Sequence, residues 1–179
     1  MVRAATFSPG KAFVVSTMTL TEDGYEVELE DRRREGCCPA CGARLTRSHG
    51  WHRRTLQDLP IAGVTLRHRV ALRRWRCGNK HCGRRTFTQA DETVFTHHGR
   101  RTVRYDDIVF HLGKALGDLS AERLFGRLGL AISDDTILRH LVRKAEDTKE
   151  ASPLRVVGID NWAWKKQHCY GTIMLDLER

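Results

Sequence analysis

Two close pairs of cysteines constrain this chain more than any other feature of its sequence. Cys38 and Cys41 form a CxxC motif, Cys77 and Cys82 form a CxxxxC motif, and 35 residues separate the two pairs. A tight turn with two Cys supplies two corners of the tetrahedron that Zn²⁺ prefers. Glycines directly after Cys41 and Cys82 favour such turns. The spacing therefore predicts one structural zinc site with four thiolate ligands.

Neighbouring residues compete for two corners of this site. Cys37 competes with Cys38, and His81 competes with Cys82. We favour Cys38 and Cys82, and we expect Cys37 and Cys169 to be spare thiols. The other histidines are scattered through the sequence without ligand spacing.

Disulfide bonds are the main alternative to a metal site. The chain contains six Cys, enough for three disulfides. The longest apolar run near the N-terminus covers residues 12–15, too short for a signal peptide or a membrane span. We therefore expect a cytoplasmic protein without membrane association, in which thiols stay reduced and clustered Cys bind metal.

Positive charge is concentrated in the segment that contains the cysteine pairs. The whole chain has 179 residues and a formal net charge of +9. Residues 37–90 contain 12 Lys and Arg but one Asp or Glu, a net charge of +11, whereas residues 1–36, 91–152 and 153–179 are near neutral. A compact domain with this charge favours an anionic partner, and nucleic acid is the usual one.

Alternating side chains predict strands in the first half of the chain. Residues 11–30 are typical of a hairpin with a turn at 21–24. Residues 64–73 alternate between a mostly apolar face and a basic face that contains Arg67, Arg69 and Arg73. Arginines on a strand surface suit phosphate contacts more than base recognition, so we expect these three to bind the DNA backbone.

Helical periodicity follows in residues 100–148. Apolar spacing predicts three helices: one over about 102–117, one starting after Ser120, and one with Ser133 as its N-cap. The short Gly-containing turn between the last two is typical of a helix-turn-helix. In the third helix we expect Ile137, Leu138, Leu141 and Val142 to face inward, and Thr136, Arg139, His140 and Arg143 to face a DNA major groove. Because this segment is nearly neutral, packing in a plain bundle or in a homodimer remains the alternative.

The composition changes again after residue 153. A linker over 149–153 leads to an apolar strand that ends at Asp160, a turn over 161–167, and a second strand over 170–177. A carboxylate at the mouth of a buried strand can bind Mg²⁺. From this pattern alone, however, Asp160 is more typical of a strand-ending cap residue.

The order of these parts resembles the N-terminal portion of bacterial insertion-sequence transposases of the ISL-three family. The resemblance covers nearly all of the chain, and its most specific pieces are residues 38–41, 54–60, 77–87 and 158–160. It implies that Asp160 is the first acid of a DDE triad on an RNase H-like sheet. Two departures are Asn161, where a second Asp is common, and Gln167, where a turn glycine is usual.

The resemblance also implies that two of the three catalytic acids lie beyond Arg179. Two-metal phosphoryl transfer needs several carboxylates around two cations about 4 Å apart, and Asp160 alone cannot supply them. We therefore expect a truncated, inactive copy, with Mg²⁺ bound only in an intact enzyme. The implied partner is double-stranded DNA at the terminal repeats of the element, in a bacterial, nucleoid-associated setting.

The sequence thus predicts an α+β protein with four parts: an N-terminal β-hairpin (1–36), a basic zinc finger (37–90), a helix-turn-helix (100–148), and the first two strands of an RNase H-like domain (153–179). The predicted function is DNA binding by a truncated transposase. The alternatives are a stand-alone zinc-dependent DNA-binding protein, such as a repressor of the intact element, and a non-functional remnant.

Overall fold

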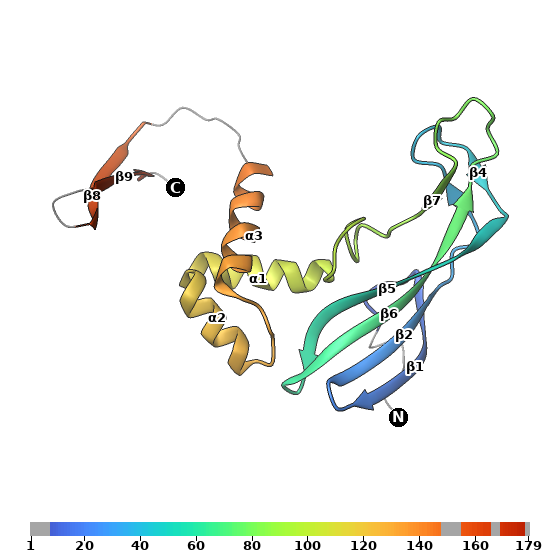
Figure 1. Ribbon diagram of the computed structural model, residues 1–179, viewed down its shortest axis with the longest axis horizontal. Coiled ribbons are helices and arrows are strands. Elements are labelled where there is room, and N and C mark those ends of the chain that lie inside the picture. Colours follow the sequence, from blue (N-terminus) through green and yellow to red (C-terminus); the bar gives the residue numbers. More distant parts are fainter. Residues whose placement is uncertain (1–7, 148–154, 166–168, 178–179) are drawn as a thin grey trace. The chain divides into compact units, whose positions relative to one another are not determined.

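The computed structural model describes residues 8–147, 155–165 and 169–177. The chain forms two compact units, Met1–Lys144 and Ala145–Arg179. The first unit contains a five-stranded sheet, a small two-stranded sheet and three helices (Figure 1). No helix among the described residues is long and apolar enough to cross a membrane.

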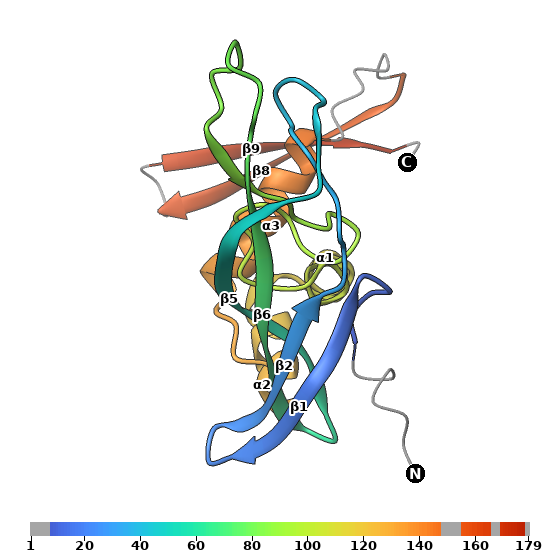
Figure 2. The ribbon, with the colours of Figure 1, turned by 90° about the vertical axis from the view of Figure 1, so that its right-hand side faces the viewer.

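The five-stranded sheet has the order β1-β2-β6-β5, with β7 paired to the end of β6 (Figure 2). Strands β5 and β6 form a long antiparallel hairpin, and β2 runs parallel to β6. The bounds are β1 (Phe13–Thr21), β2 (Gly24–Asp31), β5 (Ser48–Ile61), β6 (Val64–Arg76) and β7 (Thr86–Thr88).

The N-terminal hairpin is confirmed as β1–β2, but it is not a separate part of the fold. Six residue pairs, from Tyr25↔Leu66 to Glu30↔Ala71, join β2 to β6. The predicted boundary at residue 36 therefore does not separate two folding units. Strand β5 had no clear alternation in the sequence and was not predicted, because polar and charged side chains occupy most of its first half.

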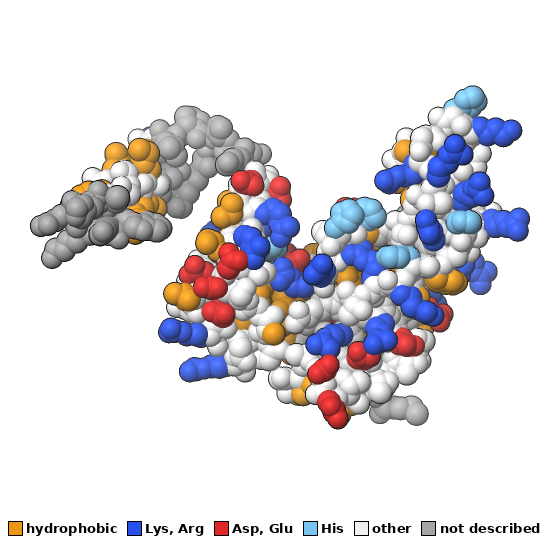
Figure 3. All heavy atoms as spheres, viewed as in Figure 1, with side chains coloured by type: hydrophobic (Ala, Val, Ile, Leu, Met, Phe, Trp, Pro, Cys, Tyr) orange, Lys and Arg blue, Asp and Glu red, His pale blue; other side chains and the backbone are white. Residues whose placement is uncertain are grey.

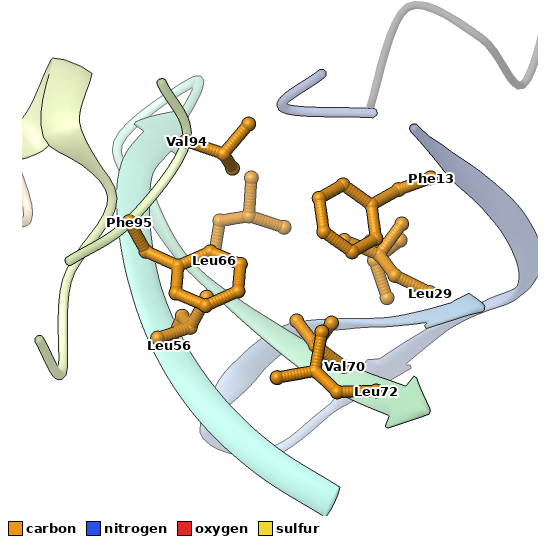
Figure 4. Packing of buried hydrophobic residues seen from close by; sticks show 9 residues of the cluster. Phe13, Leu29, Leu56, Leu66, Val70, Leu72, Val94 and Phe95 are labelled. Carbon is orange, nitrogen blue, oxygen red and sulfur yellow. The ribbon is translucent and has the colours of Figure 1, made fainter. Parts of the chain in front are cut away.

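The core of this sheet lies on one face and is closed by a segment that follows β7. Val94 and Phe95 lie against Leu56 and Leu66 from the β5–β6 hairpin, and Phe13 completes the cluster (Figure 4). All five side chains are buried. The alternation predicted for residues 64–73 is thus confirmed: the even-numbered side chains Leu66, His68, Val70 and Leu72 face this core.

Three helices follow, as predicted: α1 (Val103–Leu116), α2 (Asp118–Arg127) and α3 (Asp134–Asp147). Helix α2 begins before Ser120 because Gly117 ends α1 with a φ of 77° and the chain turns directly into the next helix. The Thr102 side chain caps α1, and the Ser133 hydroxyl accepts from the Thr136 amide, as expected for an N-cap. The three helices share a second core built on Tyr105, Val109, Ala121, Phe125, Leu130, Ile132 and Ile137.

Helix α3 presents only part of the predicted face to this core. Leu138 and Val142 are 47% and 50% exposed, although we expected them to face inward. His140, expected to face outward, is buried, with its Nε2 atom 3.1 Å from the Asp106 carbonyl oxygen. Residues three apart share a helix face, so His140 follows Ile137 into the core. Ile137 and Leu141 face the core as predicted, whereas Leu138 and Val142 lie on the exposed side of the helix.

The helices are attached to the turn of the β5–β6 hairpin. Leu59 packs against the helical core. Gly129, in the loop between α2 and α3, lies so close to the hairpin turn that a Cβ atom there would be 2.3 Å from the Gly63 carbonyl oxygen. The loop and the hairpin turn lie side by side in Figure 1. These contacts make the helices and the sheet parts of one unit.

The second unit is a two-stranded antiparallel hairpin of β8 (Val157–Lys165) and β9 (Cys169–Asp176). The two strands are confirmed, but β8 does not end at Asp160. It continues through Asn161 and Trp162, where we expected a turn, and Asp160 pairs with Ile173 within the ladder. The predicted linker over 149–153 and the departure at Gln167 lie outside the described residues.

Candidate metal centre and nucleic-acid interface

The first cysteine pair lies in a small hairpin formed by β3 (Gly36–Cys37) and β4 (Arg44–Leu45). The Gly42 amide donates to the Cys38 carbonyl, and the Cys38 amide donates to the Ala43 carbonyl. Gly42 has a φ of 72°, a conformation that favours glycine. The predicted role of the glycine after Cys41 is therefore confirmed, and the knuckle is a closed, hydrogen-bonded turn.

The second pair lies between β6 and β7, in the turn that joins these two strands. The Cys77 amide donates to the Arg85 carbonyl, and the Cys82 amide donates to Asn79. The Arg84 amide lies 3.4 Å from the Cys82 sulfur. Gly83 is not among the described glycines that have a positive φ angle. The second turn therefore does not require glycine at this position, contrary to the prediction.

The two turns bring four sulfur atoms together. The Sγ atoms of Cys38, Cys41, Cys77 and Cys82 all lie within 4.8 Å of one another. The Cys38–Cys82 and Cys41–Cys77 sulfur distances are 3.9 and 3.6 Å. Four thiolates around Zn²⁺, each at about 2.3 Å, place neighbouring sulfurs about 3.8 Å apart. The arrangement fits a structural zinc ion with all four corners filled by protein.

The two competing residues lie outside this group. Cys37 is exposed, and its sulfur lies 3.4 Å from the Gly42 carbonyl oxygen. His81 is exposed and is not a member of the cluster. A hydrogen bond from the Ala40 amide lowers the pKa of the Cys38 thiol to about 7, although burial acts in the opposite direction.

Few apolar side chains support the metal centre. Its cluster contains buried Trp75 and Phe87 beside Cys38, with Leu45 and Ala43 partly buried against them. Trp75 and Phe87 face each other across the β6–β7 pair. A core this small cannot hold two hairpin turns together by itself, so the metal is expected to supply much of the folding free energy at this end.

The basic face of β6 is not purely basic. Arg67 lies 3.3 Å from Asp23, and Arg69 lies 3.1 Å from Glu26, because the acidic strand β2 is the neighbour of β6. Arg73, further toward the metal centre, lies over the Trp51 ring at 4.7 Å. The structure thus brings two of the three predicted phosphate-binding arginines into ion pairs that no sequence pattern had indicated.

The residues predicted to contact DNA from α3 differ in their exposure. Arg139 and Arg143 are exposed on α3, and Thr136 is partly exposed at its start. Arg139 forms an ion pair with Asp135 one turn earlier. Burial lowers the pKa of His140 below its ordinary value, so this side chain is a neutral part of the core and not a DNA contact.

Asp160 stands apart from any cluster of metal ligands. Its side chain is exposed on β8. Among the described residues, only the four Cys form a group of three or more potential ligands. The chain therefore does not assemble the carboxylates that Mg²⁺-dependent phosphoryl transfer needs in the part that the structure describes, and we derive no step through magnesium.

Sequence reasoning missed a buried polar network at the helix end of the sheet. The carboxylate of Asp58, on β5, accepts hydrogen bonds from His68 (2.6 Å), Thr102 (2.7 Å), Arg104 (2.7 Å) and the Leu59 amide (2.8 Å). Burial alone would raise the pKa of Asp58, but the hydrogen bonds from His68, Arg104 and Thr102 outweigh it and hold the pKa far below its ordinary value. The available signal was that Asp58 is the one acidic residue among residues 37–90.

Arg54 fixes the loop that leads into α1. Its guanidinium donates to the carbonyls of His97 (2.6 Å) and Gly99, and it lies 5.3 Å from the centre of the Phe95 ring. The Gln57 amide donates to the Arg100 carbonyl. The segment 54–60, which carries part of the family resemblance, therefore joins the sheet to the helices.

Two hairpin turns that present four Cys around one point are characteristic of a zinc ribbon. Residues 34–82 match a family model described as the zinc-finger of transposase IS204/IS1001/IS1096/IS1165. The match begins just before β3, includes the whole β5–β6 hairpin and ends at Cys82. The chain matches no curated protein and no solved structure with which it was compared.

Proposed function

We propose that this chain binds double-stranded DNA as the DNA-binding portion of an insertion-sequence transposase of the ISL-three family. The observation that carries the proposal is the four-Cys cluster within a segment similar to a transposase zinc finger. The site residues are the zinc ligands Cys38, Cys41, Cys77 and Cys82. The net charge of +11 in residues 37–90 supports an anionic partner.

Charge also favours the metal-binding end of the sheet as the DNA contact. Lys and Arg side chains, with His among them, gather over this end in Figure 3, whereas Asp and Glu gather mainly over the helices and the opposite end of the sheet. Of the three predicted strand arginines, Arg73 alone shares its charge with no acidic partner among the described residues. Arg67 and Arg69 share theirs with Asp23 and Glu26, so we assign them the smaller contribution.

Binding of labelled duplex DNA by the zinc-loaded full chain tests this proposal. Affinity should fall steeply with salt, with a slope of about −0.9 in log K against log salt for each neutralised phosphate. Removal of the zinc by chelation should abolish binding. No measurable binding of duplex DNA at low salt, with zinc bound, would contradict the proposal.

We further propose that α2 and α3 act as a helix-turn-helix, with α3 in the major groove. The exposed face of α3 offers Arg139 and Arg143 for base edges, with Thr136 at the start of the helix and the exposed Leu138 and Val142 for apolar contact with thymine methyl groups. Arg143→Ala should cost about 1–3 kcal/mol on the preferred sequence and little on random DNA. Equal losses of affinity for the preferred sequence and for random DNA would favour a packing or dimerisation role for these helices.

The alternative function is a stand-alone zinc-dependent DNA-binding protein, such as a repressor of an intact element. The observation that favours it is the exposed Asp160, which has no cluster of carboxylates around it among the described residues. This alternative expects Asp160→Ala to leave DNA binding unchanged, and no DNA cleavage or strand transfer with Mg²⁺. Metal-dependent nicking that Asp160→Ala abolishes would instead support Asp160 as a catalytic acid.

A further inference from the structure

An open groove of about 630 Å³ lies on the sheet face opposite to the predicted arginine face. Its floor comes from the metal-binding ends of β5 and β6 and from β7, and its wall is the loop of residues 97–100. Four arginines and three histidines line it, and none of the described lining residues is Asp or Glu. We call it the cationic groove. Its lining residues include Trp51, His52, Arg74, Arg84, His98 and Arg100.

The wall of this groove is held in place without a ligand. Arg54 donates to the carbonyls of His97 and Gly99, and the Arg100 carbonyl accepts from the Gln57 amide at 2.8 Å. The neighbouring Phe95 is fully buried in the core of the sheet and lies beneath the Arg54 guanidinium. Arg54 is therefore a positioning residue. The groove is preformed, which lowers the entropic cost of binding.

The remaining arginines of the groove keep their charge for a ligand. Arg84 and Arg100 are exposed, and within the described part of the chain neither forms an ion pair; Arg74 donates only to the Thr86 hydroxyl, at 3.1 Å. On the opposite face, Arg67 and Arg69 each have an acidic partner. The groove thus contains arginines without acidic partners among the described residues, whereas two of the three arginines on the face that the sequence indicates are paired.

We propose that the cationic groove binds the sugar–phosphate backbone of duplex DNA, with Arg74, Arg84 and Arg100 as the phosphate ligands. This inference rests on the proposed function and names the surface that performs it. Phosphodiester oxygens are the complement of several guanidinium groups without carboxylates between them. Contacts of this kind position the duplex without reading its sequence.

The test compares two double variants of the zinc-loaded full chain that lose equal charge from opposite faces. Arg84→Gln/Arg100→Gln removes two cations of the groove, and Arg67→Gln/Arg69→Gln is the matched control. Binding of a labelled random-sequence duplex is measured over a salt series. The groove variant should lose affinity and show a slope shallower by about 2, one for each lost phosphate contact. The control should change the slope by less than 1.

The outcomes separate this inference from the proposed function. If the unmodified chain binds duplex DNA and the groove variant keeps its affinity and slope, the groove is not the contact surface, whereas DNA binding itself stands. A larger loss in the control variant would also overturn the inference and assign the contact to the opposite face. If the unmodified chain binds no duplex DNA, both the function and the inference fail. Zinc content and circular dichroism confirm that each variant is folded.

Discussion

The two ends of the β5–β6 hairpin are stabilised in different ways. At one end, two turns converge on four Cys around a small apolar cluster. At the other end, Leu59 packs into the helical core, and the buried Asp58 carboxylate binds Thr102 and Arg104 at the start of α1. We expect the first end to depend on a metal, whereas packing and hydrogen bonds hold the second. One hairpin thus links a region that we expect to need a metal to fold with a region that has its own helical core.

This difference has a functional consequence. The proposed phosphate ligands Arg74 and Arg84 lie at the metal end, next to the β6–β7 turn that contains Cys77 and Cys82. The proposed base-reading helix α3 belongs to the other end. Loss of the metal should therefore impair backbone binding more than it impairs the helical part.

Loss of a zinc ligand should have the largest effect, and this effect should be confined to the metal end of the hairpin. Cys77→Ser should remove the metal and unfold the turns around residues 36–45 and 77–88, because the small Trp75 cluster cannot hold them alone. Metal analysis should find zinc lost, while circular dichroism retains the helical signal of the other end. Cys37→Ser, at an exposed thiol outside the cluster, is the control and should keep its zinc. A variant with Cys77→Ser that stays fully folded without metal would contradict this assignment.

Disruption of the polar network should have the next largest effect, at the opposite end. Asp58→Asn should cost about 3–5 kcal/mol of unfolding free energy at neutral pH, because it leaves buried donors without their carboxylate. Zinc content should not change. Asp107→Asn, at an exposed position of α1, is the control and should lie within about 0.5 kcal/mol of the unmodified chain.

The cost of Asp58→Asn should also depend on pH. The folded-state pKa of Asp58 is depressed, so its contribution to stability is complete above the unfolded-state pKa of about 3.9 and decreases as pH falls below it. Chemical unfolding of both proteins between pH 7 and pH 3 measures the difference. A difference that grows in acid would contradict the ionised network.

The close contact between the helices and the hairpin turn should give a smaller effect. Gly129→Ala places a Cβ atom 2.3 Å from the Gly63 carbonyl oxygen at a φ of 78°, and should cost about 2 kcal/mol. Gly126→Ala, on the exposed side of α2 with no atom within 4 Å, should instead stabilise by about 0.5–1 kcal/mol. Thermal unfolding distinguishes the two, and equal effects would mean that Gly129 does not contact the turn.

The sequence by itself determined the elements whose chemistry is local. The spacing of Cys38, Cys41, Cys77 and Cys82 predicted the metal cluster, since a CxxC or CxxxxC turn brings its own two thiols together whatever the rest of the fold does. Helical periodicity predicted three helices, and the caps at Gly117 and Ser133 came from residues next to the helix ends. The alternation over residues 64–73 predicted which side chains of β6 enter the core.

Only the tertiary structure decided how these elements combine. Parallel pairing of β2 with β6 brought Glu26 beside Arg69 and removed charge from the predicted DNA face. The same sheet brought Asp58 to Thr102, 44 residues away, and left Arg84 and Arg100 lining one groove. Such contacts depend on strand order and on the path of the chain over the sheet. Contacts between residues that are distant in the sequence leave no short-range sequence pattern. The network and the groove were therefore not predicted.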